Sequence, residues 1–159
     1  MSKVFPGVYT AQIEGPFVVF AVGFRMNRLL AVRKWLQVAR AMNSMIEELK
    51  ANRELGFLHV EVALAWRGGR MLQYWRSFDH LHAYAHAREA KHLPAWAAFN
   101  QSVGNDGTVG IWHETYAVAA GSYECVYVNM PRFGLAVAGE HLAAVGRAQT
   151  AKGRMGMAE

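Results

Sequence analysis

Apolar and polar residues alternate along this chain with two different periods, and the periods separate strands from helices. An almost unbroken apolar run from Phe17 to Phe24 predicts a buried central strand. From Leu29 to Leu49, apolar residues recur in steps of three and four, which predicts an amphipathic helix. Two more strands are predicted, from Phe57 to Trp66 and from Met71 to Arg76, joined by the glycine-centred turn Arg67–Arg70.

The pattern continues with a second helix and two strands. Ser77 can cap a helix that begins at Phe78, and strands follow from Val109 to Val118 and from Tyr123 to Met130. The order is β-α-β-β-α-β with an added strand, a ferredoxin-like α+β arrangement in which two helices cover one face of an antiparallel sheet. Few elements remain to cover the other face, so we expect a second copy to cover it in a homodimer.

A chain of 159 residues fits one domain. We expect residues 1–135 to form a single ferredoxin-like domain, followed by a Gly/Ala-rich tail over residues 136–159. The tail shows a short helical pattern around Glu140 to Ala148 and has little to bury. It is therefore expected to wrap the domain or to fray.

Composition and charge narrow the class of protein. Hydrophobic residues make up 53% of the chain, far from the composition of disordered proteins. The formal net charge is +5, but there is no continuous basic run and no nucleic-acid motif, so no nucleic-acid partner is expected. The cationic residues gather only around the first helix, at Arg25, Arg28, Arg33, Lys34 and Arg40.

The single cysteine and the N-terminal pattern bear on the compartment. Cys125 cannot form an intrachain disulfide and is expected to be a core thiol, which fits a reducing, cytoplasmic compartment. No export leader is visible, and no apolar run approaches the ~20 residues of a membrane span. We therefore expect no membrane partner.

Polar and aromatic residues concentrate in three short blocks between residues 92 and 131. These blocks are His92–Trp96 at a helical joint, Ile111–Tyr116 on one predicted strand and Tyr127–Pro131 on the next. Polar and aromatic side chains at this density, on otherwise apolar strands and a helix, indicate a pocket for a small-molecule substrate.

These blocks resemble the small monooxygenase-like proteins of the fumagillin-pathway type, in the dimeric α/β-barrel (antibiotic biosynthesis monooxygenase-like) superfamily. The resemblance runs from about Phe17 to Leu135. It rests on Tyr74-Trp75-Arg76-Ser77-Phe78, Leu81, Tyr84-Ala85, His92-Leu93-Pro94-Ala95-Trp96, Phe99-Asn100, Val103-Gly104, Gly110-Ile111-Trp112-His113-Glu114-Thr115-Tyr116 and Tyr127-Val128-Asn129-Met130-Pro131.

The resemblance implies two ferredoxin-like sheets that form a barrel between two protomers, with a ligand cavity in each. Relatives on this fold include cofactor-independent monooxygenases, haem-degrading enzymes, haem-dependent aldoxime dehydratases and polyketide cyclases. Since one fold hosts several chemistries, the site residues must decide between them.

His113 is the expected base, because an imidazole titrates near neutral pH and a strand holds it rigidly. Strand alternation puts His113 on one face and Trp112, Glu114 and Tyr116 on the other. If the cavity lies on the His113 face, Glu114 is expected to pair with a basic residue of a helix. If it lies on the opposite face, Trp112, Glu114 and Tyr116 line the pocket instead.

Other predicted site residues lie on other elements. Tyr127 and Asn129 are expected to donate hydrogen bonds to a developing oxyanion, with Tyr74 as a further substrate contact and Trp96 as a wall. The structural alternative is that Tyr127 and Asn129 satisfy buried backbone groups.

His92 has an alternative use as an axial haem ligand, against a structural role at the helical joint. The histidines at 80, 82, 86 and 92 lack a carboxylate or cysteine to complete a ligand set, so no metal site is expected.

Three functional hypotheses remain open at this point. The first is a monooxygenase that needs no cofactor and oxidises an apolar enolisable or phenolic substrate, with His113, Tyr127 and Asn129 as catalytic residues. The second is a haem-binding enzyme that uses His92, either aldoxime-dehydratase-like or haem-handling. The third is a non-catalytic carrier of an apolar ligand.

Overall fold

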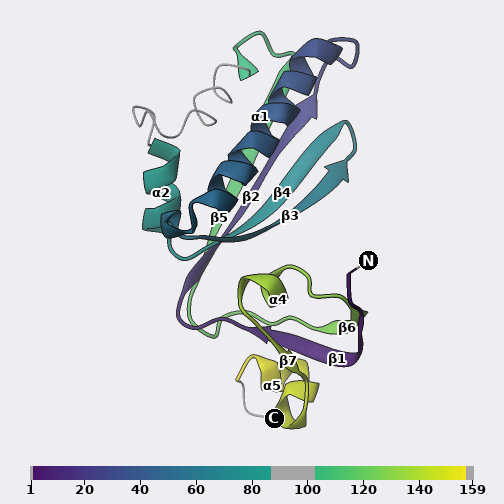
Figure 1. Ribbon diagram of the computed structural model, residues 1–159, viewed down its shortest axis with the longest axis vertical. Coiled ribbons are helices and arrows are strands. Elements are labelled where there is room, and N and C mark those ends of the chain that lie inside the picture. Colours follow the sequence, from purple (N-terminus) through teal and green to yellow (C-terminus); the bar gives the residue numbers. More distant parts are fainter. Residues whose placement is uncertain (1, 87–102, 157–159) are drawn as a thin grey trace.

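The computed structural model describes residues 2–86 and 103–156, which form two antiparallel sheets at opposite ends of an elongated molecule (Figure 1). The larger sheet has the order β3-β4-β2-β5 and the smaller one the order β6-β1-β7. The strands are β1 Phe5–Gln12, β2 Phe17–Met26, β3 Phe57–Ala65, β4 Gly68–Trp75, β5 Val109–Val118, β6 Tyr127–Met130 and β7 Glu140–Ala143. The helices are α1 Val32–Ala51, α2 Phe78–His86, α4 Leu135–Ala138 and α5 Ala151–Arg154, with 3₁₀ turns at Arg53–Leu55 and Gly146–Gln149.

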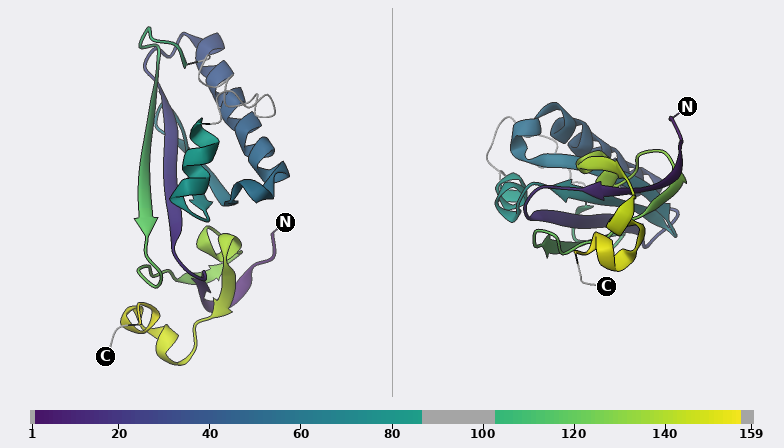
Figure 2. Two further views of the ribbon diagram at one scale, coloured as in Figure 1. Left: turned by 90° about the vertical axis from the view of Figure 1, so that its left-hand side faces the viewer. Right: turned by 90° about the horizontal axis from the view of Figure 1, so that it is seen from below.

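The larger sheet confirms the ferredoxin-like prediction. Its elements follow one another as β2-α1-β3-β4-α2-β5, and α1 and α2 lie on the same face of the sheet (Figures 1 and 2). The core between them contains fully buried residues from both layers, among them Val38 and Leu49 of α1 and Trp75 of β4. Among the described residues, neither α1 nor α2 covers the opposite face of this sheet (Figure 2).

The smaller sheet differs from the sequence prediction in all three of its strands. No strand was predicted before Phe17, yet β1 pairs with both β6 and β7. The added strand is shorter than predicted, because only Tyr127–Met130 of the expected Tyr123–Met130 pairs with a neighbour. In the expected tail, Glu140–Ala143 forms β7 rather than a helix, and its partner is the first strand of the chain.

The hairpin between β3 and β4 turns two residues earlier than predicted. Ala65 pairs with Gly68, so the turn consists of Trp66 and Arg67, and the glycines belong to β4. Glycine stands at position 68 of the strand because β4 and β2 approach closely there. A Cβ on Gly68 would stand 1.9 Å from the carbonyl oxygen of Phe24 in β2. Gly68 is therefore required by packing and not by the turn.

Among the described residues, no helix is both long enough and apolar enough to cross a lipid bilayer.

The close approach at Gly68 predicts the outcome of one substitution. Gly68→Ala should lower the free energy of unfolding by about 1–3 kcal/mol, because the added methyl overlaps the Phe24 carbonyl and the strands must separate. Gly110→Ala is the matched control, since its Cβ would meet only side-chain atoms, of Asn27 at 3.3 Å and of Arg25 at 4.0 Å. Equal midpoints for the two variants in urea unfolding would contradict this account of the hairpin.

Candidate functional site

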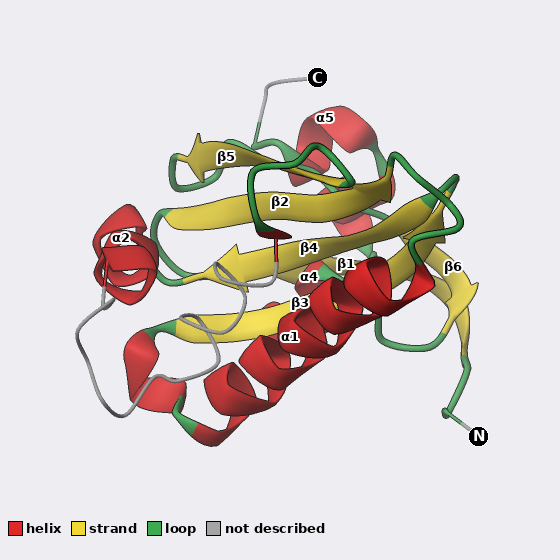
Figure 3. Cartoon of the chain, turned by 90° about the horizontal axis from the view of Figure 1, so that it is seen from above, coloured by secondary structure: helices red, strands yellow, loops and turns green. Residues whose placement is uncertain are grey.

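The helix-covered face of the larger sheet holds a cavity that contains His113. The cavity has a volume of about 70 Å³, room for a few water molecules. It lies between the sheet and the helices α1 and α2, and Figure 3 shows α1 running along the sheet near β3, with α2 beside the ends of the strands. Its lining comes from β2, α1, β4, α2 and β5: Phe20, Val22, Met42, Met45, Met71, Gln73, Trp75, Leu81, Tyr84, Ala85, Ile111 and His113.

His113 reaches this cavity because of strand alternation in β5. Ile111 and His113 line the cavity, whereas Trp112 between them points to the open face. The imidazole lies 5.4 Å from the ring of Phe20, measured between centroids, and no hydrogen bond to it is formed by the described residues. Within the described part of the chain, both ring nitrogens are thus unpaired. Of the two faces that the sequence left open, the structure puts the cavity on the His113 face.

Gln73 is a second polar residue of the cavity, and sequence reasoning missed it. Its side chain is only 3% exposed, and its Oε1 accepts a hydrogen bond of 2.9 Å from Nε1 of Trp75. This bond fixes the orientation of the amide, whose Nε2 makes no hydrogen bond to another described residue. The sequence did carry a signal for Gln73. It is a polar residue between Met71 and Trp75, on the face of the strand that alternation otherwise makes apolar.

Tyr84 closes the cavity from α2. Its hydroxyl donates a hydrogen bond of 3.0 Å to Oε1 of Glu48 on α1. Burial, and secondarily the negative charge and hydrogen bond of Glu48, raises the pKa of Tyr84 well above its usual range. Tyr84 therefore stays protonated and ties α2 to α1, so it contributes a wall and a fixed hydroxyl but no base.

The three predicted substrate residues of β5 lie on the open face and do not meet His113. The Tyr116 hydroxyl donates a 2.6 Å hydrogen bond to Oε2 of Glu114, and among the described residues Glu114 forms no ion pair with a basic residue of a helix. The Trp112 indole packs over Gly23 of β2, which has no side chain to obstruct it. A Cβ on Gly23 would stand 2.8 Å from the indole. Trp112 is 40% exposed and Tyr116 is 53% exposed.

Tyr74 and Tyr127 meet between the two sheets, away from the cavity. A Cβ on Gly134 would lie 3.0 Å from the Tyr74 hydroxyl oxygen and 3.8 Å from that of Tyr127. Burial, and then the neighbouring Cys125, raises the pKa of Tyr127, while burial and Glu61 raise that of Tyr74. Both phenols belong to the second apolar cluster of the protein, which joins the sheets.

Asn129 has the structural role that the sequence analysis gave as its alternative. Its Oδ1 accepts a hydrogen bond of 2.9 Å from the backbone N–H of Gly7, which links β6 to β1. His92 and Trp96 lie outside the described residues, so the structure neither supports nor opposes a haem ligand at His92. The described part of the chain contains no group of three or more side chains able to hold a metal ion.

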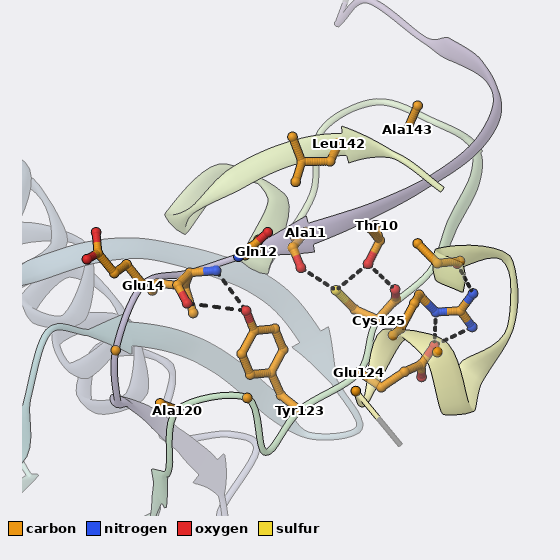
Figure 4. A pocket seen from close by; sticks show the side chains of 17 residues that line it. Thr10, Ala11, Gln12, Glu14, Ala120, Tyr123, Glu124, Cys125, Leu142 and Ala143 are labelled. Atoms are coloured by element: carbon orange, nitrogen blue, oxygen red, sulfur yellow. Dashed lines mark hydrogen bonds and ion pairs between the residues drawn. The ribbon is translucent and has the colours of Figure 1, made fainter. Parts of the chain in front are cut away.

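A larger hollow of about 510 Å³ lies beside the smaller sheet, between β1 and the C-terminal segments (Figure 4). The Arg154 guanidinium forms an ion pair with Glu124 there, and it donates hydrogen bonds to the carbonyl oxygens of Ala148 and Gln149. The Cys125 thiol lies 3.9 Å from the Thr10 hydroxyl oxygen and 3.8 Å from the Ala11 carbonyl oxygen. This hollow contains no histidine and no free cation among its lining residues.

Comparison with known proteins finds a family match and similar folds. Residues 17–135 match the family described as Monooxygenase af470-like. Monooxygenase af470 of Aspergillus fumigatus is 31% identical in an alignment 152 residues long that covers 81% of this chain and 53% of the relative. The chain thus spans about half the length of this curated relative.

Two solved structures of aldoxime dehydratases share the fold at low sequence identity. One was co-crystallised with butyraldoxime and is 13% identical, with a TM-score of 0.62 over 84% of this chain and 42% of that one. The other is 14% identical, with a TM-score of 0.60 over 84% of this chain and 43% of that one. Both matches show that the fold is shared, and nothing more.

The raised tyrosine pKa values predict how the protein responds to alkali. Tyr74, Tyr84 and Tyr127 have pKa values above the ordinary ~10, so each stabilises the fold below that pH and loses this contribution as the pH rises past it. Absorbance at 295 nm should show fewer than the six tyrosines titrating near pH 10 in the folded protein, and all six in denaturant. Tyr84→Phe should reduce the loss of stability above pH 10; six phenols titrating together in the folded state would refute the burial argument.

Proposed function

Because the chain belongs to the Monooxygenase af470-like family, we propose that it is a monooxygenase that acts in the helix-side cavity. Its substrate would be an apolar enolisable or phenolic small molecule, and the reaction would need no bound cofactor. One observation carries the proposal: an imidazole without a hydrogen-bond partner among the described residues, His113, and an oriented amide, Gln73, line the same apolar cavity. The relative is about twice as long as the matched part, so activity and substrate are inferred from the site.

His113 would act as the base. It accepts a proton from the enol or phenol, and the resulting anion is electron-rich enough to transfer electrons to dioxygen. One oxygen atom enters the substrate and the other leaves as water, so that a phenol and dioxygen give a quinone and water. The substrate supplies the two electrons that reduce the second oxygen atom.

Gln73 would hold the developing oxyanion through its Nε2 donor. A buried, pre-oriented donor stabilises a developing charge more strongly than water does, because it does not reorient during the reaction. The other lining residues are apolar except Tyr84, so the cavity favours an aromatic or aliphatic substrate. Met42, Met45 and Met71 supply unbranched, flexible side chains, whose rearrangement would admit a substrate larger than the cavity of about 70 Å³.

Two other places are less suitable for this chemistry. The Tyr74 and Tyr127 phenols are protonated and packed between the sheets. Of the histidines near them, His59 is paired with Glu61, and His141, whose ring lies 6.2 Å from that of Tyr127, is beyond the family match. The 510 Å³ hollow draws part of its lining, including Leu142 and Arg154, from residues beyond the family match. The helix-side cavity, by contrast, lies within the matched region.

Substitution of the base tests this assignment. His113→Ala should lower kcat by about 10²- to 10⁴-fold in an oxygen-electrode assay with phenolic and enolisable substrates. His82→Ala is the matched control, since His82 is exposed on α2 and does not line the cavity. Full activity in His113→Ala would refute the proposal, and ligand binding without oxygen consumption in the wild type would favour a carrier.

The absence of a cofactor is tested on the same preparation. The purified active protein should show no absorbance band between 300 and 700 nm. A saturable Soret band on titration with hemin, lost in His92→Ala, would instead support the haem alternative.

We also propose that the open face of the larger sheet pairs with a second copy of the chain. Trp112, Tyr116 and Leu72 are large apolar or aromatic residues, each more than a third exposed on that face. A sheet with one uncovered apolar face favours association, and the isologous contact of a twofold dimer covers both copies at once.

A charge on this face should prevent pairing. Trp112→Asp is expected to convert a dimer into a monomer in analytical ultracentrifugation, since each interface would bury two unpaired carboxylates. Val126→Asp serves as the control, because Val126 is 46% exposed and lies outside the open face. A monomeric wild-type protein, or an unchanged mass for Trp112→Asp, would overturn the dimer proposal.

A further inference from the structure

Large apolar side chains extend into solvent at one end of the larger sheet. Leu64 is 96% exposed and Trp66 is 90% exposed on the β3–β4 hairpin, and Leu30 is 97% exposed in the loop before α1. Arg67 holds the two segments together, since its Nη2 donates a hydrogen bond of 2.9 Å to the carbonyl oxygen of Asn27. Figure 1 shows the hairpin turn and the β2–α1 loop at the same upper end of the sheet.

The charge of this end is strongly positive. We call it the basic-apolar end and define it by Leu30, Leu64 and Trp66 together with the cations of the same segments. The only carboxylate in the segments 25–36, 62–70 and 104–110 is Asp106, which is paired with Lys34 at 2.6 Å. The cations are Arg25, Arg28, Arg33, Lys34, Arg67 and Arg70.

A nearly fully exposed tryptophan beside two exposed leucines leaves apolar surface in water, which becomes favourable when those side chains enter an apolar phase. Tryptophan prefers the boundary between lipid chains and headgroups, and arginine can lay its apolar stem along that boundary while its guanidinium meets phosphate. The combination matches the chemistry of an anionic membrane surface.

We propose that the basic-apolar end docks on an anionic phospholipid surface. Leu30, Leu64 and Trp66 enter the interfacial layer, and Arg25, Arg28 and Arg70 contact lipid phosphates. The contact is peripheral, and it departs from the expectation of no membrane partner, which rested on the lack of a membrane-spanning run. It leaves the helix-side cavity and the open face of the sheet free. It does not depend on the reaction proposed above.

Two other occupants fit the surface less well. A second copy placed symmetrically on this end would bring like charges together, which opposes association. A nucleic acid would satisfy the arginines through its phosphates, but Leu30 and Leu64 would gain nothing from phosphate contacts.

Vesicle sedimentation tests the proposal with the intact chain. The protein should co-sediment with vesicles of one part phosphatidylglycerol to three parts phosphatidylcholine, and much less with phosphatidylcholine alone. Trp66→Ser combined with Leu64→Ser should weaken the partitioning by about tenfold or more, because apolar area no longer leaves water. The double substitution Arg28→Ala and Arg70→Ala should also weaken partitioning to the anionic vesicles, and this loss should be smaller at high salt.

The control is Val145→Ser, which removes an apolar side chain that is 69% exposed in the C-terminal region, next to the smaller sheet. It should bind vesicles as the wild type does, and circular dichroism should show all variants folded. Three results would overturn the proposal. They are no binding to anionic vesicles, binding that is indifferent to Trp66 and Leu64, and a change in the oligomeric state of the lipid-free protein on their replacement.

Discussion

The pairing of β2 with a strand on each side is the constraint on which the rest of the larger sheet depends. β2 pairs with β5 along all of Phe17–Met26 and with β4 from Val18 to Arg25. Successive side chains point to opposite faces, so one register decides both faces together. The register that puts Phe20 beside His113 on the helix side also puts Gly23 beneath Trp112 on the open side. A slip of one residue would exchange the two environments.

The two faces consequently differ in chemistry. The helix side combines an apolar lining with a few fixed polar groups, namely His113, Gln73 and the Tyr84–Glu48 pair. The open side presents aromatic rings and a hydrogen bond from Tyr116 to the Glu114 carboxylate. The first arrangement suits a small ligand and the second suits a flat protein contact, and the proposed functions follow this division.

Much of the larger sheet could be predicted from local pattern, and the smaller sheet could not. Val109–Val118 was predicted to the residue, since its length and alternation are visible locally. β1 contains Pro6 and Gly7 and pairs only with segments more than a hundred residues away, such as Tyr9 with Tyr127. A four-residue strand such as β7 carries too few positions to show alternation, so only its pairing with β1 identifies it.

The site was predicted in part for the same reason. Alternation separated His113 from Trp112 and Glu114, but which face carried the helices could not be known from β5 alone. Gln73 was missed because its role depends on the Trp75 indole that orients it. Tyr74, Tyr127 and Asn129 were grouped with His113 as polar residues on neighbouring strands. Tyr127 and Asn129 belong to the smaller sheet instead, and Tyr74 lies on the opposite face of β4 from the cavity.

The central claim is that a ligand binds against His113, and histidine-selective NMR tests it most directly. The protein has seven histidines, and the His113 signals can be assigned by their loss in His113→Asn. Titration with a small phenol such as 1-naphthol should shift the His113 ring signals in a saturable way and leave those of His59, between the sheets, unchanged. Saturable shifts of His59 with His113 unmoved would contradict the account and place the binding site between the two sheets.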